Sequence, residues 1–148
     1  MTIADAVIDM MNETKEATSN LRTFTPADLE TLYSSAYHLY NQGSYVKASD
    51  LFMQLTLSNP YEETYWRGLA STYQMQSLWN EALHAWSLCA ILKENDPLPH
   101  YHAAECLYSQ QEIEDALKAL SLARLHCKED DESTLLPKIQ LLQELCSR

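Results

Sequence analysis

The sequence predicts an all-α fold built from three helix–turn–helix units. The first observation is a fixed step of 34 residues, which is the period of a repeat made of two helices. At this step alanine recurs in two registers: Ala36, Ala70 and Ala104, and Ala48, Ala82 and Ala116. The second observation is that large side chains recur beside these alanines: Leu32, Trp66 and His100; Leu39, Tyr73 and Leu107; Tyr45, Trp79 and Ile113; Phe52, Trp86 and Leu120. Helix packing constrains size more than identity, so size repeats while the letters change.

The third observation is helical spacing within each unit, bounded by turn residues. Apolar residues follow one another three or four positions apart, as expected for helices with one buried face. Gly43 falls between the first two helices, where a helix end favours a left-handed residue, and Pro60 ends the second one. Pro97 and Pro99 open the third unit. The predicted helix pairs are 29–42 with 45–58, 63–76 with 79–92, and 97–110 with 113–126.

An additional helical piece precedes the repeats. Thr25 is predicted to cap a helix that has Pro26 at its first position. Further upstream, one face of a short amphipathic segment carries Ile3, Val7, Met10 and Met11. This segment either covers the first repeat or pairs with a second copy of the chain.

Another helix is predicted after the repeats, where it covers the open end of the last unit, as solenoids require. One stripe of this helix carries Leu135, Ile139, Leu142 and Cys146. Pro137 is tolerated there only in the first turn. The predicted organisation is therefore a helical segment at 1–24, three repeats over 29–130 (29–62, 63–96 and 97–130), and a capping helix at 131–148.

The composition excludes several classes of function. The 148 residues include only two glycines, which leaves no glycine-rich loop for a phosphate or a dinucleotide. The formal net charge of −11 disfavours nucleic acid and anionic membranes as partners. No apolar run approaches the ~18 residues of a membrane helix, and the N-terminus shows no secretory signal. The four cysteines form no C-x-x-C pair, so we expect a cytosolic protein with reduced thiols.

Candidates for catalysis or metal binding are few. His102 and Cys106 are four residues apart, which is a metal-ligand spacing on a helix, but no second pair of ligands stands near them in the sequence. Paired carboxylates such as Glu62 and Glu63 fall at unit boundaries, where solvated turns are expected. We therefore predict no enzyme activity, no metal and no cofactor.

A tyrosine-rich stripe is predicted on the first helices of the three pairs, which line the concave side of such a fold. Spacings of i, i+4 and i+7 place three residues of each helix on one face. These are Tyr33, Tyr37 and Tyr40; Arg67, Ser71 and Gln74; and Tyr101, Glu105 and Tyr108. Tyrosine offers a large rigid surface and a hydroxyl at low entropic cost, so the stripe predicts a peptide-binding groove. The alternative is that some rings only pack against neighbouring helices.

The repeated positions resemble the tetratricopeptide repeat family. The matching residues are Leu32, Ala36, Leu39, Gly43, Tyr45, Ala48, Phe52 and Pro60 in the first unit; Trp66, Leu69, Ala70, Tyr73, Ala82 and Trp86 in the second; and Ala104, Leu107, Ala116, Leu120 and Ala123 in the third. The third unit departs from the pattern at Gln111 and Lys128. A closer resemblance, over nearly the whole chain beyond about residue 24, is to the class II translocator chaperones of bacterial type III secretion. It rests on the run from Tyr33 to Ala48, on RGLA at 67–70 and on HAAECL at 102–107.

The resemblance implies a right-handed superhelix of three repeats that acts as a chaperone in the bacterial cytoplasm. It implies that a segment of a pore-forming translocator lies extended in the concave groove, and that the chain forms a weak homodimer through its N-terminal region. Co-chaperones of the wider repeat family clamp acidic peptides with several cations, whereas this stripe has only Arg67. The expected partner is therefore an extended peptide with apolar side chains. The alternative function is a general tetratricopeptide scaffold that joins two folded proteins.

Overall fold

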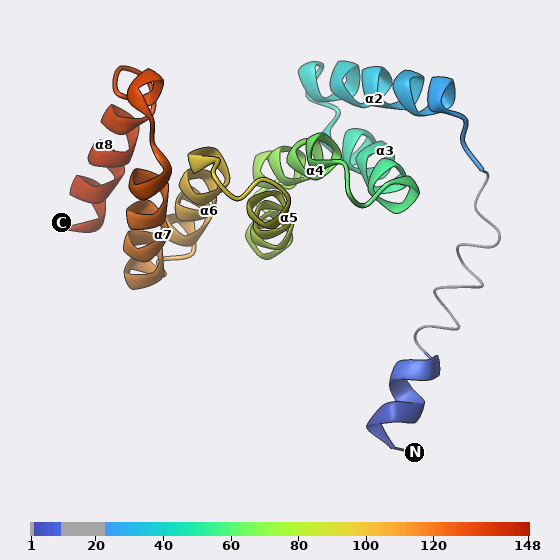
Figure 1. Ribbon diagram of the computed structural model, residues 1–148, viewed down its shortest axis with the longest axis horizontal. Helices are drawn as coiled ribbons and strands as arrows, with labels where there is room; N and C mark the ends of the chain where they lie inside the picture. Colours follow the sequence, from blue (N-terminus) through green and yellow to red (C-terminus); the bar gives the residue numbers. More distant parts are fainter. Residues whose placement is uncertain (1, 10–22) are drawn as a thin grey trace.

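The protein is a curved array of antiparallel helix pairs. The computed structural model describes residues 2–9 and 23–148, and the described part contains helices, turns and no strand (Figure 1). The helices after residue 23 are α2 (Pro26–Asn41), α3 (Tyr45–Ser58), α4 (Glu63–Met75), α5 (Trp79–Leu92), α6 (Pro97–Ser109), α7 (Ile113–His126), the short 3₁₀ helix η1 (Glu129–Asp131) and α8 (Leu136–Cys146). This arrangement confirms the predicted all-α repeat fold.

The observed helices agree closely with the ranges predicted from the 34-residue step. Helices α3, α5 and α7 begin and end at the predicted residues, and α4 and α6 end one residue early. Helix α2 begins at Pro26, three residues before the predicted start, because Thr25 caps it. The Thr25 hydroxyl accepts a hydrogen bond from the backbone N–H of Asp28 at 3.2 Å, and the Asp28 carboxylate accepts one from the N–H of Thr25 at 3.0 Å. This reciprocal pair is a capping box.

In each pair, the turn has a residue in the left-handed backbone conformation at the same repeat position, although only one of the three residues is glycine. Gly43 has a φ of 79°, and its equivalents Ser77 and Gln111 have φ values of 59° and 63°. In the first turn the N–H of Ser44 donates to the carbonyl of Leu39 at 2.9 Å, and the same bond recurs in the other two turns. The helix end therefore dictates the geometry, and two non-glycine residues adopt a conformation that is less favourable for them.

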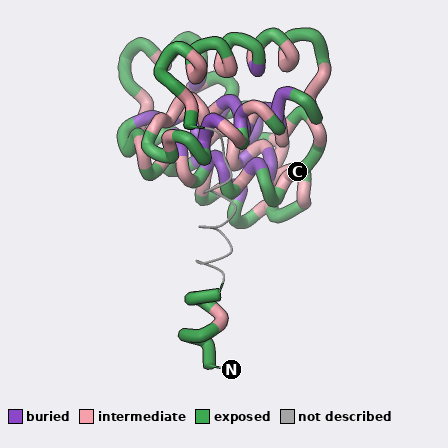
Figure 2. The backbone as a smooth tube through the Cα atoms, turned by 90° about the vertical axis from the view of Figure 1, so that its right-hand side faces the viewer, coloured by how far each residue is buried: buried purple, intermediate pink, exposed green. Residues whose placement is uncertain are grey.

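The close-packed positions are those that the repeat predicted. All six recurring alanines have no exposed surface, as predicted for positions where two helices approach closely: Ala36, Ala48, Ala70, Ala82, Ala104 and Ala116. Figure 2 shows the buried residues in the interior of the array, between helices that are otherwise intermediate or exposed. Phe52 fills the space between α3 and α4, and it faces the backbone of Gly68.

Helix α8 covers the end of the third pair, as predicted. Ile139 is fully buried and Leu142 is 8% exposed, and they share one cluster with Ala104 of α6 and Leu120 of α7. Pro137 lies in the first turn of α8, where its missing N–H costs no hydrogen bond. An aliphatic stripe on α8 thus closes the end of the solenoid.

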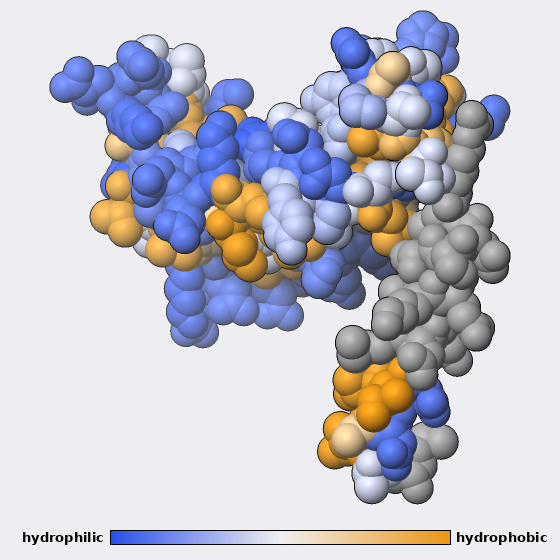
Figure 3. All heavy atoms as spheres, turned by 45° about the vertical axis from the view of Figure 1, so that its right-hand side comes forward, coloured by the Kyte–Doolittle hydropathy of each residue, from blue (hydrophilic) through white to orange (hydrophobic). Residues whose placement is uncertain are grey.

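At the N-terminus, residues 3–9 are helical. Ile3 is 86% exposed, Val7 is 48% exposed and Ile8 is 54% exposed. Figure 3 shows the apolar atoms of this segment gathered on one side of it. The predicted face also included Met10 and Met11, which lie outside the described residues. Within 2–9 and 23–148, the structure contains no helix with the length and hydropathy needed to span a bilayer.

Candidate peptide-binding groove

All nine residues of the predicted stripe lie on α2, α4 and α6, with three residues on each helix. In Figure 1 the pairs α2 with α3, α4 with α5, and α6 with α7 follow one another along the array. Each of the nine is neither fully buried nor fully exposed. Half-burial of a large amphipathic ring fixes the ring and leaves part of its surface available to a partner.

The three tyrosines of α2 form one aromatic cluster. The ring of Tyr37 packs edge-on against Tyr33 at 4.9 Å between centroids and against Tyr40 at 6.4 Å. Phe52 supports the cluster from below, with its centroid 5.3 Å from that of Tyr37. Burial and hydrogen bonding to Tyr33 raise the pKa of Tyr37 well above its ordinary value, so its hydroxyl remains protonated and able to donate a hydrogen bond. Tyr65 of α4 extends the cluster, 5.6 Å from Tyr33.

Arg67, the only cation of the stripe, is occupied by two carboxylates. Its Nη2 lies 2.6 Å from Oδ2 of Asp96, and its Nε donates to Oε1 of Glu63 at 2.8 Å. Burial acts to raise the pKa of Asp96, but the hydrogen bond from the backbone of Leu98 and the Arg67 guanidinium outweigh it, and the pKa lies below its ordinary value. Because both acids neutralise Arg67, this residue is not free to bind the carboxylate of a partner.

Gln74 and Glu105 belong to a hydrogen-bonded network that joins three helices. Trp86 Nε1 of α5 donates to Gln74 Oε1 at 3.0 Å, and Gln74 Nε2 donates to Glu105 Oε1 at 3.3 Å. His102 Nδ1 lies 2.6 Å from the same Glu105 oxygen, and its ring stacks on Trp86 at 4.6 Å between centroids. The stripe is therefore polar and internally ordered where α4 meets α6.

Tyr101 and Tyr108 belong to a different part of the stripe from the α2 tyrosines. Both rings pack against the cluster that α8 forms with α6 and α7. Tyr108 also lines a hollow of about 620 Å³ together with Leu145 and Cys146 at the end of α8. The structure therefore places three tyrosines at the α2 end of the stripe and two at the α6 end, with Gln74 of α4 between them and Glu105 on the same helix as the last two.

The sequence did not predict that four further residues lie beside the stripe: Tyr65, Trp86, Asp96 and His102. Tyr65, Trp86 and Asp96 contact stripe residues on other elements across 12 to 32 positions in the sequence, and the 34-residue pattern does not predict these contacts. His102 contacts Glu105 within α6 and stacks on Trp86 of α5. The spacing in the sequence presents His102 only as a candidate metal ligand with Cys106. Cys106 is fully buried, and burial raises the pKa of its thiol to about 12, whereas His102 faces Trp86 and Glu105.

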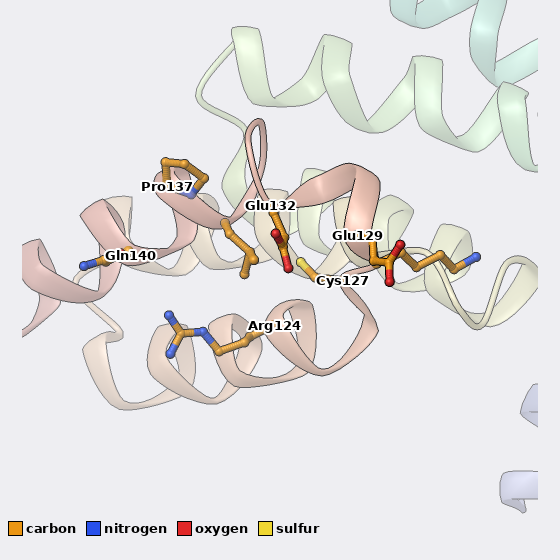
Figure 4. Close-up of a pocket in the computed structure, with 8 residues that line it drawn as sticks. Arg124, Cys127, Glu129, Glu132, Pro137 and Gln140 are labelled. Atoms are coloured by element: carbon orange, nitrogen blue, oxygen red, sulfur yellow. The ribbon is translucent and has the colours of Figure 1, made fainter.

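A second concavity lies outside the stripe, between the end of α7, the loop that follows it and α8. Its volume is about 790 Å³, and Arg124, Cys127 and Glu132 line it. Figure 4 shows these side chains on facing segments, with Pro137 and Gln140 on the α8 side. Its walls mix charges of both signs, and burial raises the pKa of the Cys127 thiol. This concavity is not part of the predicted groove.

Comparison with known proteins finds a matching repeat family and similar chains. Residues 29–57 and 65–96 match the family model of the tetratricopeptide repeat. The low calcium response locus protein H of Yersinia pestis is 31% identical over 125 residues, which cover 79% of this chain and 74% of the relative. The chaperone protein SicA of Salmonella dublin is 26% identical over 121 residues, covering 81% of this chain and 72% of SicA.

Two solved structures share the fold over most of this chain. The Yersinia enterocolitica type III secretion chaperone SycD, in complex with a peptide of the translocator YopD, has a TM-score of 0.79 and is 27% identical, covering 85% of this chain and 97% of SycD. PcrH, in complex with the chaperone binding region of PopD, has a TM-score of 0.79 and is 26% identical, covering 86% of this chain and 96% of PcrH. This chain belongs to the class II translocator chaperones of type III secretion, a family built on tetratricopeptide repeats.

Proposed function

We propose that this chain binds an extended segment of hydrophobic translocator subunits along α2, α4 and α6, and keeps these subunits soluble in the bacterial cytoplasm until export. The observation that carries the proposal is the stripe of half-buried tyrosines on three successive helices of a chain that belongs to this family. The relatives SycD and PcrH bind segments of YopD and PopD. The function is binding, without catalysis, a metal or a cofactor.

The physical need for such a partner follows from the chemistry of a pore-forming protein. Its membrane-inserting segments expose apolar surface that aggregates in water. A chain with a formal net charge of −11 that covers one such segment keeps the pair dispersed through charge repulsion. The neutralised Arg67 supports an apolar segment over an acidic one, because the stripe offers no free cation for a carboxylate.

Co-expression tests this function directly. A candidate translocator encoded beside this chain is expressed with a tag, alone and together with the chain. We expect the translocator to be insoluble alone and to co-purify with the chain when both are present. A translocator that remains soluble without the chain, or that does not retain it on the column, contradicts the proposed function. The general-scaffold alternative predicts co-purification with folded proteins unrelated to secretion.

We further propose that the chain forms a weak homodimer through its N-terminal helical segment. Ile3 and Val7 lie exposed on residues 3–9, and Met10 and Met11 continue the predicted face. A related structure of SycD contains a dimer. Exposed aliphatic side chains on one side of a helix gain stability when a second apolar surface covers them.

Removing residues 1–22 should leave the repeats folded and shift the protein towards monomer. The capped start of α2 lies after the deletion, so the circular dichroism spectrum per residue should remain helical. Light scattering across a concentration series measures the change in mass. Full-length protein that is monomeric at high micromolar concentration would rule out this dimer.

A further inference from the structure

A carboxylate, that of Glu105, is held in a fixed position on α6, between Tyr101 and Tyr108 along the helix. Trp86 Nε1 can only donate, so its bond to Gln74 fixes which end of the Gln74 amide is the oxygen. The amide nitrogen must then point at Glu105, to which it donates at 3.3 Å. The orientation of Gln74 is therefore set by a buried tryptophan on a neighbouring helix.

His102 holds the same carboxylate from the other side. An ionised carboxylate only accepts hydrogen bonds, so His102 Nδ1, at 2.6 Å, carries the proton in this contact. The near-parallel stack on Trp86, with 20° between the ring planes, fixes the imidazole. Burial, and after it the nearby Glu105 carboxylate, raises the pKa of Tyr101. The carboxylate is thus pre-oriented by Gln74 and His102 before any partner arrives.

Two of the groups around this carboxylate cannot cancel its charge, because Gln74 and Tyr101 are uncharged. His102 carries a positive charge only when both of its ring nitrogens are protonated. The only cation of the stripe, Arg67, is already balanced by Glu63 and Asp96. The Glu105 side chain is 34% exposed, so a partner can reach it. A carboxylate offers about four acceptor positions, and the bonds from Gln74 and His102, both to Oε1, do not fill them.

We propose that Glu105 binds a lysine or arginine side chain of the extended segment and so sets the register of that segment relative to the tyrosines of α2 and α6. The inference rests on the proposed function and adds a charge requirement to it. An apolar peptide can slide along a groove lined by rings alone, whereas one charge-assisted hydrogen bond at a fixed point selects a single register. The competing explanation is that the network only joins α4, α5 and α6.

The test uses a positional series of synthetic peptides based on the YopD peptide that SycD binds. Each peptide carries a single lysine, glutamine or glutamate at one position, and binding to full-length protein is measured by calorimetry. At one position we expect lysine to bind roughly tenfold more tightly than glutamine, with glutamate weaker than both. Glu105→Gln should remove this preference, because the glutamine oxygen still accepts from Gln74 and His102 but carries no charge.

Glu112→Gln is the matched control, because it changes the net charge equally at an exposed residue between α6 and α7. It should retain the lysine preference, and both variants should melt near the wild-type temperature. Peptides that bind the wild type with no lysine preference, or a preference that survives Glu105→Gln, overturn the inference and leave the proposed function standing. If no peptide of the series binds the wild type, the proposed function fails and the inference fails with it.

Discussion

Replacing Gly68 by alanine should destabilise the protein by about 3 kcal/mol, although alanine is the better helix former. Gly68 lies inside α4, where glycine alone weakens a helix by about 1 kcal/mol. A Cβ at this position would fall inside the contact distance of three ring atoms of Phe52. Phe52 is fully buried and packs edge-on against Tyr33 and Tyr37, so its ring has no free space into which to move.

A double-mutant cycle separates this clash from any other effect of the substitution. In a Phe52→Leu background the ring is absent, and Gly68→Ala should cost far less or become stabilising through its helix propensity. Urea unfolding at 25 °C gives the four free energies of unfolding. Equal costs in both backgrounds would show that contact with Phe52 is not the reason for glycine in this helix.

The sequence was sufficient for the helix pairs because packing repeats at a fixed step. The third pair illustrates this, since the family model matches only 29–57 and 65–96. Ala104 and Ala116 nevertheless keep the step, and α6 and α7 form where they were predicted. The turn between α6 and α7 shows the same point. The end of α6 imposes a left-handed conformation on Gln111, although glutamine does not favour it.

The candidate groove was only partly predictable. Helical spacing predicted one face of three helices for these nine residues, and they lie on α2, α4 and α6, but it could not show which of them are occupied by neighbours. Arg67 is neutralised by Asp96, and Glu105 is held by Gln74, across 29 and 31 positions in sequence. Such side-chain contacts depend on how α4, α5 and α6 pack against one another. No local pattern in the sequence predicts this packing.

The Gly68 contact was missed for a related reason. A single glycine within a helix lowers helix stability, so its presence suggests that another part of the chain packs closely against the backbone there. The glycine does not indicate which residue makes that contact. Only the structure identifies Phe52 of the preceding helix, and with it the link between the core and the tyrosines of α2.

Truncating one tyrosine at each end of the stripe should weaken binding of a translocator segment by about a thousandfold. Tyr40 packs with Tyr37 and Tyr45 at one end, whereas Tyr101 packs against the α8 cluster at the other. A tyrosine that anchors a partner contributes about 2 kcal/mol on truncation. In the described part of the chain, no ring contact joins Tyr40 to Tyr101. The losses of binding free energy from Tyr40→Ala and Tyr101→Ala should therefore add, to about 4 kcal/mol.

The control must separate lost contacts from lost folding, because both rings also support neighbouring helices. Tyr61→Ala is the matched variant, since Tyr61 is 82% exposed in the turn between α3 and α4 and lies off the stripe. It should bind like the wild type, and each single stripe variant should lose about thirtyfold. Circular dichroism and the melting temperature of the double variant should remain near those of the wild type. A folded double variant that binds with full affinity would move the site away from α2 and α6, because the free energy of binding would then come from contacts that these two rings do not make.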